Sequence, residues 1–417
     1  MTAEERTSTT YRWERWRALS GGINESAGVL FLLLIAVRWY GAGPLAKALV
    51  AGGGSIGLLL SPWLVSRVEA AQLPVARAAA RLSALGGFSF LLMAMVPTLP
   101  VFVAGSAIAM ATASATIPLL TQIYQDNYPA GERGRLFART MIIRIGTAAL
   151  CCELGGRLLT SHIGLFRWLL LVFAAGCGAA SYCLSRCPSN PLSASAGTHP
   201  FRALRFARDD RVFRQTLIAW MFIGFAMLMM SPLRVEYLAN PKYGITVDGR
   251  MLTATTIALL TGVIPNLARL VLNPVWGWLF DHMNFFKLRL LLNLGFSLGI
   301  LSFFTTGNMQ GLVVGALLFG ISNAGADVAW GLWVTKFAPP GRVADYMSVH
   351  TFFTGVRGVV APLVAFSSVA SLSPHTLGWI SVGLITTGSA FLISEIAIAP
   401  GSKPGQPPAV ETSPDRE

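Results

Sequence analysis

The residues of this sequence most able to do chemistry are charged side chains that stand inside long apolar runs. They are Glu25, Arg144, Arg269, Asp327 and Arg357. A charged group within a lipid bilayer is costly, and such groups usually mark a substrate or ion pathway. These five residues are therefore the first candidates for a functional site, provided that the runs around them cross a membrane.

Distance along a helix indicates how deep these groups lie. Glu25, Arg144 and Asp327 are eight or nine residues from the nearest expected membrane surface, which at a rise of about 1.5 Å per residue is about 12 to 14 Å. Arg269 and Arg357 are each twelve residues from an aspartate expected at the inner surface. That distance is about 18 Å, close to the middle of a hydrocarbon core of about 30 Å.

We expect the three arginines, Arg144, Arg269 and Arg357, to hold an anionic group, either that of a substrate or that of a partner side chain. Asn323 precedes Asp327 by four residues. The two therefore share a helix face, and Asn323 joins the expected substrate site.

Asp327 and Glu25 are expected to be the protonatable groups that couple solute movement to ion movement. A carboxyl group removed from water binds a proton more readily, so its protonation can follow the accessibility of the cavity. The alternative is that Asp327 forms a fixed ion pair with an arginine and only holds helices together. For Glu25 the same two interpretations stand open.

Two further charged pairs are expected nearer the membrane surfaces. Glu153 and Arg157 are four residues apart, and this spacing predicts an ion pair within one helix. Arg234 and Glu236 are expected on a solvated rim at an outer mouth, with a gating role as the alternative.

Composition indicates the solvent of this chain. Hydrophobic residues make up 53% of the 417 residues and charged residues 12%, against about 25% charged in a soluble domain. The net charge is +13, but arginine and lysine recur between alternate apolar runs and are scarce in the intervening connections. This positive-inside pattern predicts an inner (plasma) membrane protein with both termini in the cytoplasm, and it needs no nucleic acid as a partner.

Twelve segments are long and apolar enough to cross a bilayer as helices, which takes about 20 residues. They are expected near residues 19–38, 44–66, 79–97, 100–124, 136–159, 164–185, 214–234, 252–280, 288–306, 309–335, 346–370 and 376–398. The sequence therefore predicts an all-α polytopic membrane protein with a cytoplasmic segment at 1–18, a six-helix bundle at 19–185, a cytoplasmic loop at 186–213, a second six-helix bundle at 214–398 and a disordered tail at 399–417. For the central loop, an amphipathic segment on the membrane surface and a solvated linker both fit.

A proline-glycine loop occurs once in each half of the chain. One copy is Tyr128–Gly131 and the other is Ala338–Gly341. Each follows a long apolar run, and the copies are separated by about half of the chain. Internal similarity at that period indicates two membrane-embedded halves built on one plan.

A second loop carries a more specific pattern. Gly277-Trp278-Leu279-Phe280-Asp281-His282 is followed by Lys287 and Arg289. With twelve spans in two halves and a basic middle loop, this pattern resembles the major facilitator superfamily, whose loop after the second helix of a half has a glycine, a spacer, an aspartate and basic residues. The resemblance implies that Gly277, Asp281, Lys287 and Arg289 form a gating loop that latches the halves together on the cytoplasmic side.

The resemblance also implies a secondary transporter in which two helix bundles rock around a central substrate. The equivalent loop of the first half, residues 62–67, has no aspartate. Symport, antiport and uniport are left open, because helices four and five lack the motifs that mark coupling in the family. The buried arginines favour an anionic or zwitterionic small solute, and the two carboxylates favour protons as the coupling ion. A monomer is expected.

Other classes of function have less support. A polytopic membrane enzyme would need a nucleophile, a base or a metal cluster near one face, but the five histidines and five cysteines show no ligand-like spacing. We therefore expect no catalytic residue, no metal and no cofactor, and interpret the cysteines as small packing residues. A transport-inactive sensor or assembly protein with the same fold is the other alternative.

Overall fold

The computed structural model describes residues 1–129, 132–192, 205–247, 249–336 and 343–398, and these residues are almost entirely helical. Parts of both proline-glycine loops, the middle of the expected central loop and the expected disordered tail at 399–417 lie outside the described residues.

The N-terminal half contains six membrane-length helices, some of them interrupted. The first is α1 (Ala3–Ser26), the π-helical turn η1 (Ala27–Phe31) and α2 (Leu32–Arg38) in continuous succession. The others are α3 (Pro44–Ala70), α4 (Val75–Met95), α5 (Leu99–Ala115) with α6 (Ile117–Asn127), α7 (Arg133–Ser161), and the short η2 (Ile163–Leu165) with α8 (Phe166–Ser185).

The C-terminal half repeats this plan. It begins with α9 (Arg205–Asp209) and α10 (Arg211–Ala239), followed by η4 (Pro241–Tyr243) and a hairpin of β1 (Thr246–Val247) and β2 (Arg250–Met251), antiparallel with Thr246 opposite Met251. The second long helix of this half, which is the eighth of the chain, consists of α11 (Ala254–Ala258), the π-helical turn η5 (Leu259–Val263) and α12 (Ile264–His282). The remaining elements are α13 (Phe285–Thr305), α14 (Met309–Leu332), η6 (Trp333–Lys336), α15 (Val343–Ser368) and α16 (Pro374–Ile398).

Side-chain caps fix where several helices begin, because they satisfy backbone N–H groups that have no partner within the helix. At the start of α1 the Thr2 backbone N donates to Glu5 Oε2 at 2.8 Å, and the Glu5 backbone N donates to Thr2 Oγ1 at 3.2 Å. Asn308 caps α14 by accepting from the Gly311 backbone N at 2.8 Å. Because this capping box starts α1 at Ala3, most of residues 1–18 belong to the first helix. The sequence predicts a separate segment before the first bundle there.

Eleven helices of the described residues are long and apolar enough to cross a membrane. The expected fifth span, near 136–159, is not among them, because α7 carries too many charged residues: Arg133, Arg135, Arg139, Arg144, Glu153 and Arg157. Yet α7 is 29 residues long and packs along α1 in its own half and along α11 and α12 in the other. Its charges can therefore meet protein groups. The predicted fold class, twelve helices in two six-helix bundles, is confirmed.

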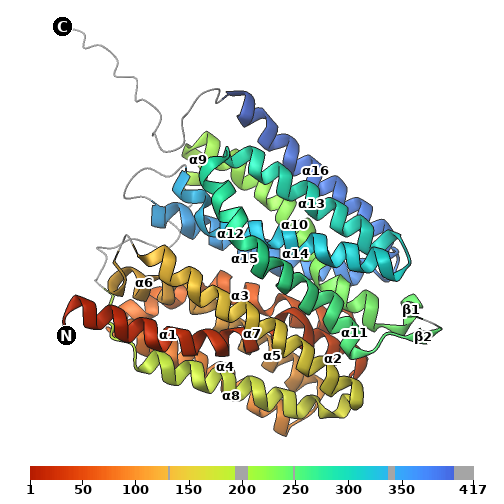
Figure 1. Ribbon diagram of the computed structural model, residues 1–417, viewed down its shortest axis with the longest axis horizontal. Coiled ribbons are helices and arrows are strands. Elements are labelled where there is room, and N and C mark those ends of the chain that lie inside the picture. Colours follow the sequence, from red (N-terminus) through yellow and green to blue (C-terminus); the bar gives the residue numbers. More distant parts are fainter. Residues whose placement is uncertain (130–131, 193–204, 248, 337–342, 399–417) are drawn as a thin grey trace.

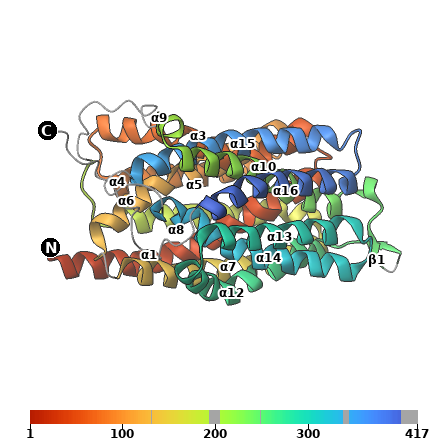
Figure 2. The ribbon, with the colours of Figure 1, turned by 90° about the horizontal axis from the view of Figure 1, so that it is seen from above.

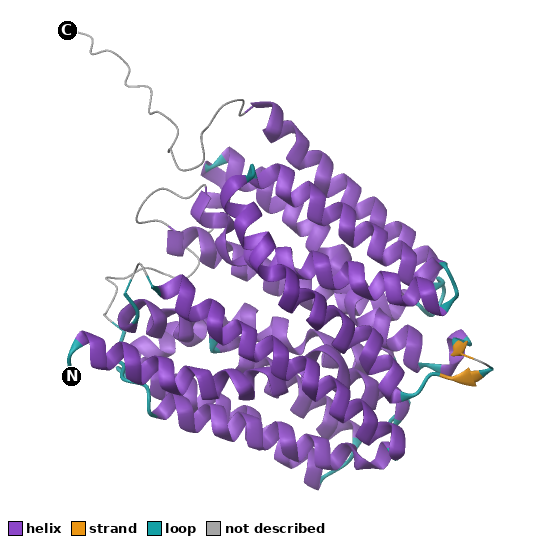
Figure 3. Ribbon diagram, viewed as in Figure 1, coloured by secondary structure: helices purple, strands orange, loops and turns teal. Residues whose placement is uncertain are grey.

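The two bundles lie side by side, with α1 to α8 in one and α10 to α16 in the other (Figure 1). Helix α1 begins and α16 ends at one end of the molecule, here called the termini end, and the β1–β2 hairpin lies at the opposite hairpin end (Figures 1 and 2). The ribbons of the bundles lie close together near the hairpin end and spread apart toward the termini end (Figure 3). We call the boundary between the bundles the seam.

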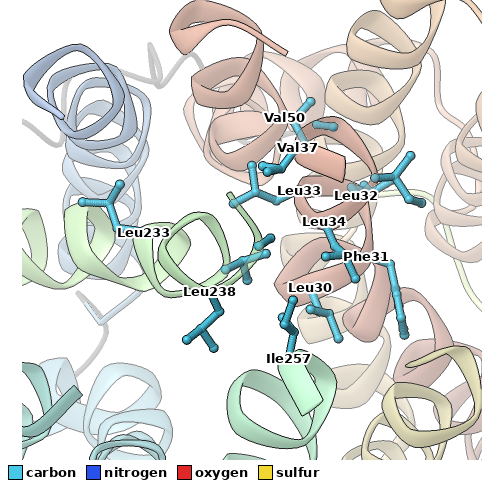
Figure 4. Close-up of a cluster of buried hydrophobic side chains, with 14 of the residues drawn as sticks. Leu30, Phe31, Leu32, Leu33, Leu34, Val37, Val50, Leu233, Leu238 and Ile257 are labelled. Carbon is cyan, nitrogen blue, oxygen red and sulfur yellow. The ribbon is translucent and has the colours of Figure 1, made fainter. Parts of the chain in front are cut away.

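The largest hydrophobic core crosses the seam near the hairpin end. Leu30 and Leu34 of the first helix are fully buried, as is Ile257 of α11, and Leu238 of α10 is 1% exposed. These side chains belong to one cluster built from both bundles (Figure 4). Within a bilayer such a contact is stabilised by van der Waals packing rather than by exclusion of water. It fixes the hairpin-end segments of the first and eighth helices and thereby positions the charged residues that follow along them.

Candidate functional site

Four charged side chains, from α1, α7, α12 and α14, meet at the seam. The Glu25 carboxylate on α1 accepts hydrogen bonds from Arg144 Nε of α7 at 2.6 Å and from Arg269 Nη1 of α12 at 2.7 Å. Arg269 also binds Asp327 Oδ2 of α14, at 2.8 Å from Nη2 and 3.0 Å from Nε. We call Glu25, Arg144, Arg269 and Asp327 the central charge network. It joins two residues of the N-terminal bundle to two of the C-terminal bundle.

Exposure differs along the central charge network. The side chains of Glu25 and Arg269 are 10% and 11% exposed, whereas those of Arg144 and Asp327 are 40% and 39% exposed. A charge that faces hydrocarbon is costly, so we infer that Arg144 and Asp327 face the space between the bundles. The network thus has a shielded middle and two accessible ends. Its formal charges sum to zero.

Close helix packing brings Glu25 to Arg144. A methyl group at Gly22 would collide with the backbone oxygen of Arg144 and lie 2.7 Å from Thr147 Cβ. Only glycine therefore allows α1 and α7 to approach this closely. The π-helical turns η1 and η5 also contact each other across the seam, and η1 begins two residues after Glu25. Such turns occur frequently at functional sites.

Two asparagines lie beside the network. Asn266, which the sequence analysis did not single out, is 5% exposed and accepts a hydrogen bond from Arg269 Nη1 at 2.8 Å. Its position three residues before Arg269, on the same helix face, is the signal that could have identified it. Asn323 lies one turn before Asp327 on α14 and is half-buried. Its side chain makes no hydrogen bond within the described part of the chain.

Arg357 lies apart from the central charge network. It is 4% exposed on α15, where its Nη1 donates to the Trp220 carbonyl and its Nη2 donates to Thr354 Oγ1 at 3.2 Å. Arg357 and Arg144 each lie on the fifth long helix of their half, α15 and α7. In the structure Arg144 turns into the seam, whereas Arg357 packs against α10 inside the C-terminal bundle.

The residues expected to form a gating loop are mostly helical. Gly277 and Asp281 belong to the last turns of α12, and Lys287 belongs to the first turn of α13. Asp281 and Lys287 are exposed and, within the described residues, form no ion pair with the other half. Arg289 is not in a loop: it lies in α13 and is 2% exposed, because the helix begins at Phe285 and turns this side chain into the bundle.

A second ion pair crosses the seam near the hairpin end. Lys47 Nζ of α3 lies 2.6 Å from Glu236 Oε1 of α10, and the two side chains are 8% and 1% exposed. Asn240 Nδ2 donates to the same carboxylate oxygen at 2.7 Å. Arg234 is 4% exposed and stacks over the Phe319 ring at 4.2 Å. The expectation that Arg234 and Glu236 lie on a solvated rim is therefore wrong. Glu236 is buried against Lys47 at the seam, and Arg234 is buried against Phe319 inside the C-terminal bundle.

Neutral hydrogen bonds also join the halves at the hairpin end. Arg38 Nη2 donates to the Leu252 carbonyl at 3.0 Å, and the hydroxyls of Thr160 and Thr255 lie 2.8 Å apart. Beside them is a cavity of about 320 Å³ between α2, α7 and α11, with Arg38 in its lining. Among the described residues, the hydrogen bonds between the halves are confined to this end and to the central charge network.

Two minor predictions can be compared directly with the structure. Glu153 and Arg157 form the expected pair within α7, with Arg157 Nε 2.7 Å from Glu153 Oε1. All five cysteines are free, and four of them, Cys152, Cys177, Cys183 and Cys187, are buried. Burial fits their interpretation as small packing residues.

Long apolar helices in two repeated bundles, with charges gathered at the seam, define a multi-pass membrane protein with the architecture of a transporter. Comparison with family models agrees with this class: the model described as Major Facilitator Superfamily matches residues 40–362. The chain belongs to this family. A comparison with curated protein sequences found no match.

Solved structures with the same fold include several transporters. The nucleoside transporter NupG is similar with a TM-score of 0.70 at 13% identity, over 93% of this chain and 99% of that one. The human organic anion transporter MFSD10 (TETRAN) has a TM-score of 0.65 at 15% identity, over 94% and 100%. A D-xylose-proton symporter has a TM-score of 0.64 at 15% identity, over 94% and 96%. At these identities the likeness concerns the fold alone.

Proposed function

We propose that this protein is a secondary active transporter that moves a small anionic or zwitterionic solute across the inner membrane by alternating access, coupled to protons. The observation that carries the proposal is the ion pair between Glu25 and Arg269, at 2.7 Å, which joins the two bundles at the seam. Rocking of the bundles must change the surroundings of this pair, so it is suited to couple conformation to charge.

The pattern of contacts supports a conformation that is open at the termini end. Lys47 pairs with Glu236, and Thr160 with Thr255, across the seam at the hairpin end. The positive-inside pattern assigns the termini end to the cytoplasm, so this is an inward-open conformation. Opening toward the other side requires these hairpin-end contacts to separate, as alternating access demands.

The charge balance of the network supports coupling. Each arginine is already neutralised by Glu25 or Asp327, so an anionic solute must compete with these carboxylates for Arg144 or Arg269. Protonation of a carboxylate removes that competitor and releases an arginine for the solute. Asp327 suits this role because its side chain is 39% exposed and can exchange protons with water in the space between the bundles.

The structural relatives support transport without selecting the solute. They are described as transporters of nucleosides, of organic anions and of D-xylose. The two arginines of the network favour the anionic class for this chain, because guanidinium groups bind carboxylate and phosphate groups through paired hydrogen bonds.

The experiment is uptake into proteoliposomes under an imposed pH gradient, with a panel of labelled carboxylates, phosphates and amino acids. For a transported solute, Asp327→Asn should abolish accumulation against a gradient while leaving exchange intact. Asp126→Asn, which changes an exposed carboxylate of α6 outside the network, is the matched control and should accumulate solute like the wild type. If the Asp327→Asn protein also concentrates solute like the wild type, Asp327 is not a coupling group. If no solute of the panel is moved, the transport-inactive alternative gains support.

A further inference from the structure

Two further arginines are buried beside a histidine and a tryptophan inside the C-terminal bundle, away from the seam. The group consists of Arg289 of α13, Arg357 and His350 of α15, and Trp220 of α10, and we call it the arginine-tryptophan cluster. Arg289 is 2% exposed, Arg357 4%, His350 0% and Trp220 4%. Among the described residues, none of the four forms a hydrogen bond or an ion pair with the central charge network.

The cluster is organised around the Trp220 ring. The guanidinium carbon of Arg289 lies 4.0 Å from the ring centroid, and that of Arg357 lies 5.8 Å from it. The His350 ring centroid is 5.2 Å from that of Trp220. Two guanidinium groups and an imidazole are thus gathered around one aromatic side chain.

Hydrogen-bond donors in the cluster are buried without acceptors. These are Nε and Nη1 of Arg289, Nε of Arg357, Nε1 of Trp220 and the ring nitrogens Nδ1 and Nε2 of His350, one of which carries a proton in the neutral ring. A buried donor without a partner is destabilising, and more so when it is charged. Several such donors in one place therefore indicate an acceptor that belongs to a ligand.

Among the side chains that the structure describes, no carboxylate forms an ion pair with this cluster. The carboxylates of Glu236 on α10, Asp327 on α14 and Asp210 at the start of α10 have other partners, which are Lys47, Arg269 and the Tyr346 hydroxyl. Cation–π contact with Trp220 stabilises an arginine, but by less than an unpaired buried charge destabilises the fold. The ring alone does not offset the burial of two like charges.

The position of Arg357 is built into the fold. A side chain at Gly224 would collide with the Arg357 guanidinium, so the glycine leaves the room that this group fills. Its hydrogen bonds to the Trp220 carbonyl and to Thr354 hold the guanidinium plane in place. Arg357 Nε, on this fixed guanidinium group, is buried without a hydrogen-bond acceptor.

We propose that the arginine-tryptophan cluster binds a small oxyanion, of the size of a carboxylate or nitrate group, at a site distinct from the transport site. Such an anion accepts the paired, coplanar hydrogen bonds that guanidinium groups donate. Its negative charge offsets one of the two arginine charges and lowers their mutual repulsion. By bonding to donors on several helices it ties α10, α13 and α15 together, which stabilises the C-terminal bundle.

The experiment is thermal unfolding of the full-length protein in detergent during titration with sodium acetate or sodium nitrate. Bulky gluconate replaces these anions to hold ionic strength constant. We expect a saturable rise of the wild-type unfolding temperature, of about 2 °C or more. Arg289→Met should abolish this anion-dependent rise. In gluconate alone the same variant should be at least as stable as the wild type, because it removes an unpaired buried charge. Arg289→Lys should need a higher anion concentration for half-saturation.

Arg144→Met is the control that separates this site from the proposed transport site. It alters the central charge network and should keep the anion-dependent rise. A rise that is lost in Arg144→Met but kept in Arg289→Met would overturn the proposal and place the anion at the seam. A wild-type protein with no saturable rise in either anion would overturn it as well, whether or not the variants fold. Solute flux is not used, so failure of the proposed transport function leaves this result interpretable.

Discussion

Glu25 of α1 and Arg269 of α12 are 244 residues apart in the chain, yet Arg269 Nη1 lies 2.7 Å from Glu25 Oε1. Each belongs to a helix interrupted by a π-helical turn, and each binds a further charged residue of its own bundle. The bundles therefore meet through a shared carboxylate as well as through packing. A change to that carboxylate is expected to affect both stability and conformational exchange.

Glu25→Gln should be strongly destabilising. The substitution keeps the shape of the side chain but leaves Arg144 and Arg269 without their shared anion, and breaking a buried ion pair from one side costs about 3–5 kcal/mol. We expect a lower unfolding temperature in detergent and loss of coupled uptake. Glu153→Gln, in the exposed pair within α7, should cost about 0.5 kcal/mol or less. Equal losses in the two variants would argue against a special role for Glu25.

Gly22→Ala should separate α1 from α7. The added methyl group would collide with backbone atoms of α7, and overpacking of this kind typically costs about 1–3 kcal/mol. Thermal unfolding measures the loss. Gly146→Ala lies on α7, and its methyl group would meet nothing within 4 Å, so this variant should unfold like the wild type. The prediction fails if Gly22→Ala is as stable as Gly146→Ala.

Reversal of one charge in the hairpin-end pair should stop transport, and reversal of both should restore it. Lys47→Glu places a second carboxylate beside Glu236, whose side chain is 1% exposed, and two buried like charges repel. The double variant Lys47→Glu with Glu236→Lys re-forms the pair in the opposite sense. Uptake into proteoliposomes is the measurement. Full activity of the single variant would show that the pair does not close the hairpin end.

Labelling of introduced cysteines should place the two ends on opposite sides of the membrane. Thr246 in β1 and Ala71 after α3 are both exposed, at the hairpin and termini ends respectively. In intact cells a membrane-impermeant thiol reagent should modify Thr246→Cys, whereas Ala71→Cys should react only after permeabilisation. The wild-type chain provides the background, since four of its five cysteines are buried. The reverse pattern would invert the predicted topology.

The sequence by itself was sufficient for the fold class and for the list of charges within the helices. Hydropathy and helix length are local properties, so each expected span coincides with a helix, including α7 with its many charges. The cost of placing a charge in hydrocarbon singled out Glu25, Arg144, Arg269 and Asp327 before any contact was known. The i, i+4 spacing in one helix likewise predicted the pair of Glu153 with Arg157.

The tertiary structure decided which charges meet. Arg144 and Arg357 occupy comparable positions in the two halves, but one turns into the seam and the other into its own bundle. Arg234 and Glu236 were expected at a solvated rim and are buried. Glu236 pairs with Lys47, which is 189 residues away in the other half, and Arg234 lies over the Phe319 ring of its own bundle. Pairings of this kind depend on how helices rotate and pack against one another. A single sequence shows which residues share a face of each helix. It does not show how each helix is rotated about its axis, and this rotation determines which side chains pair.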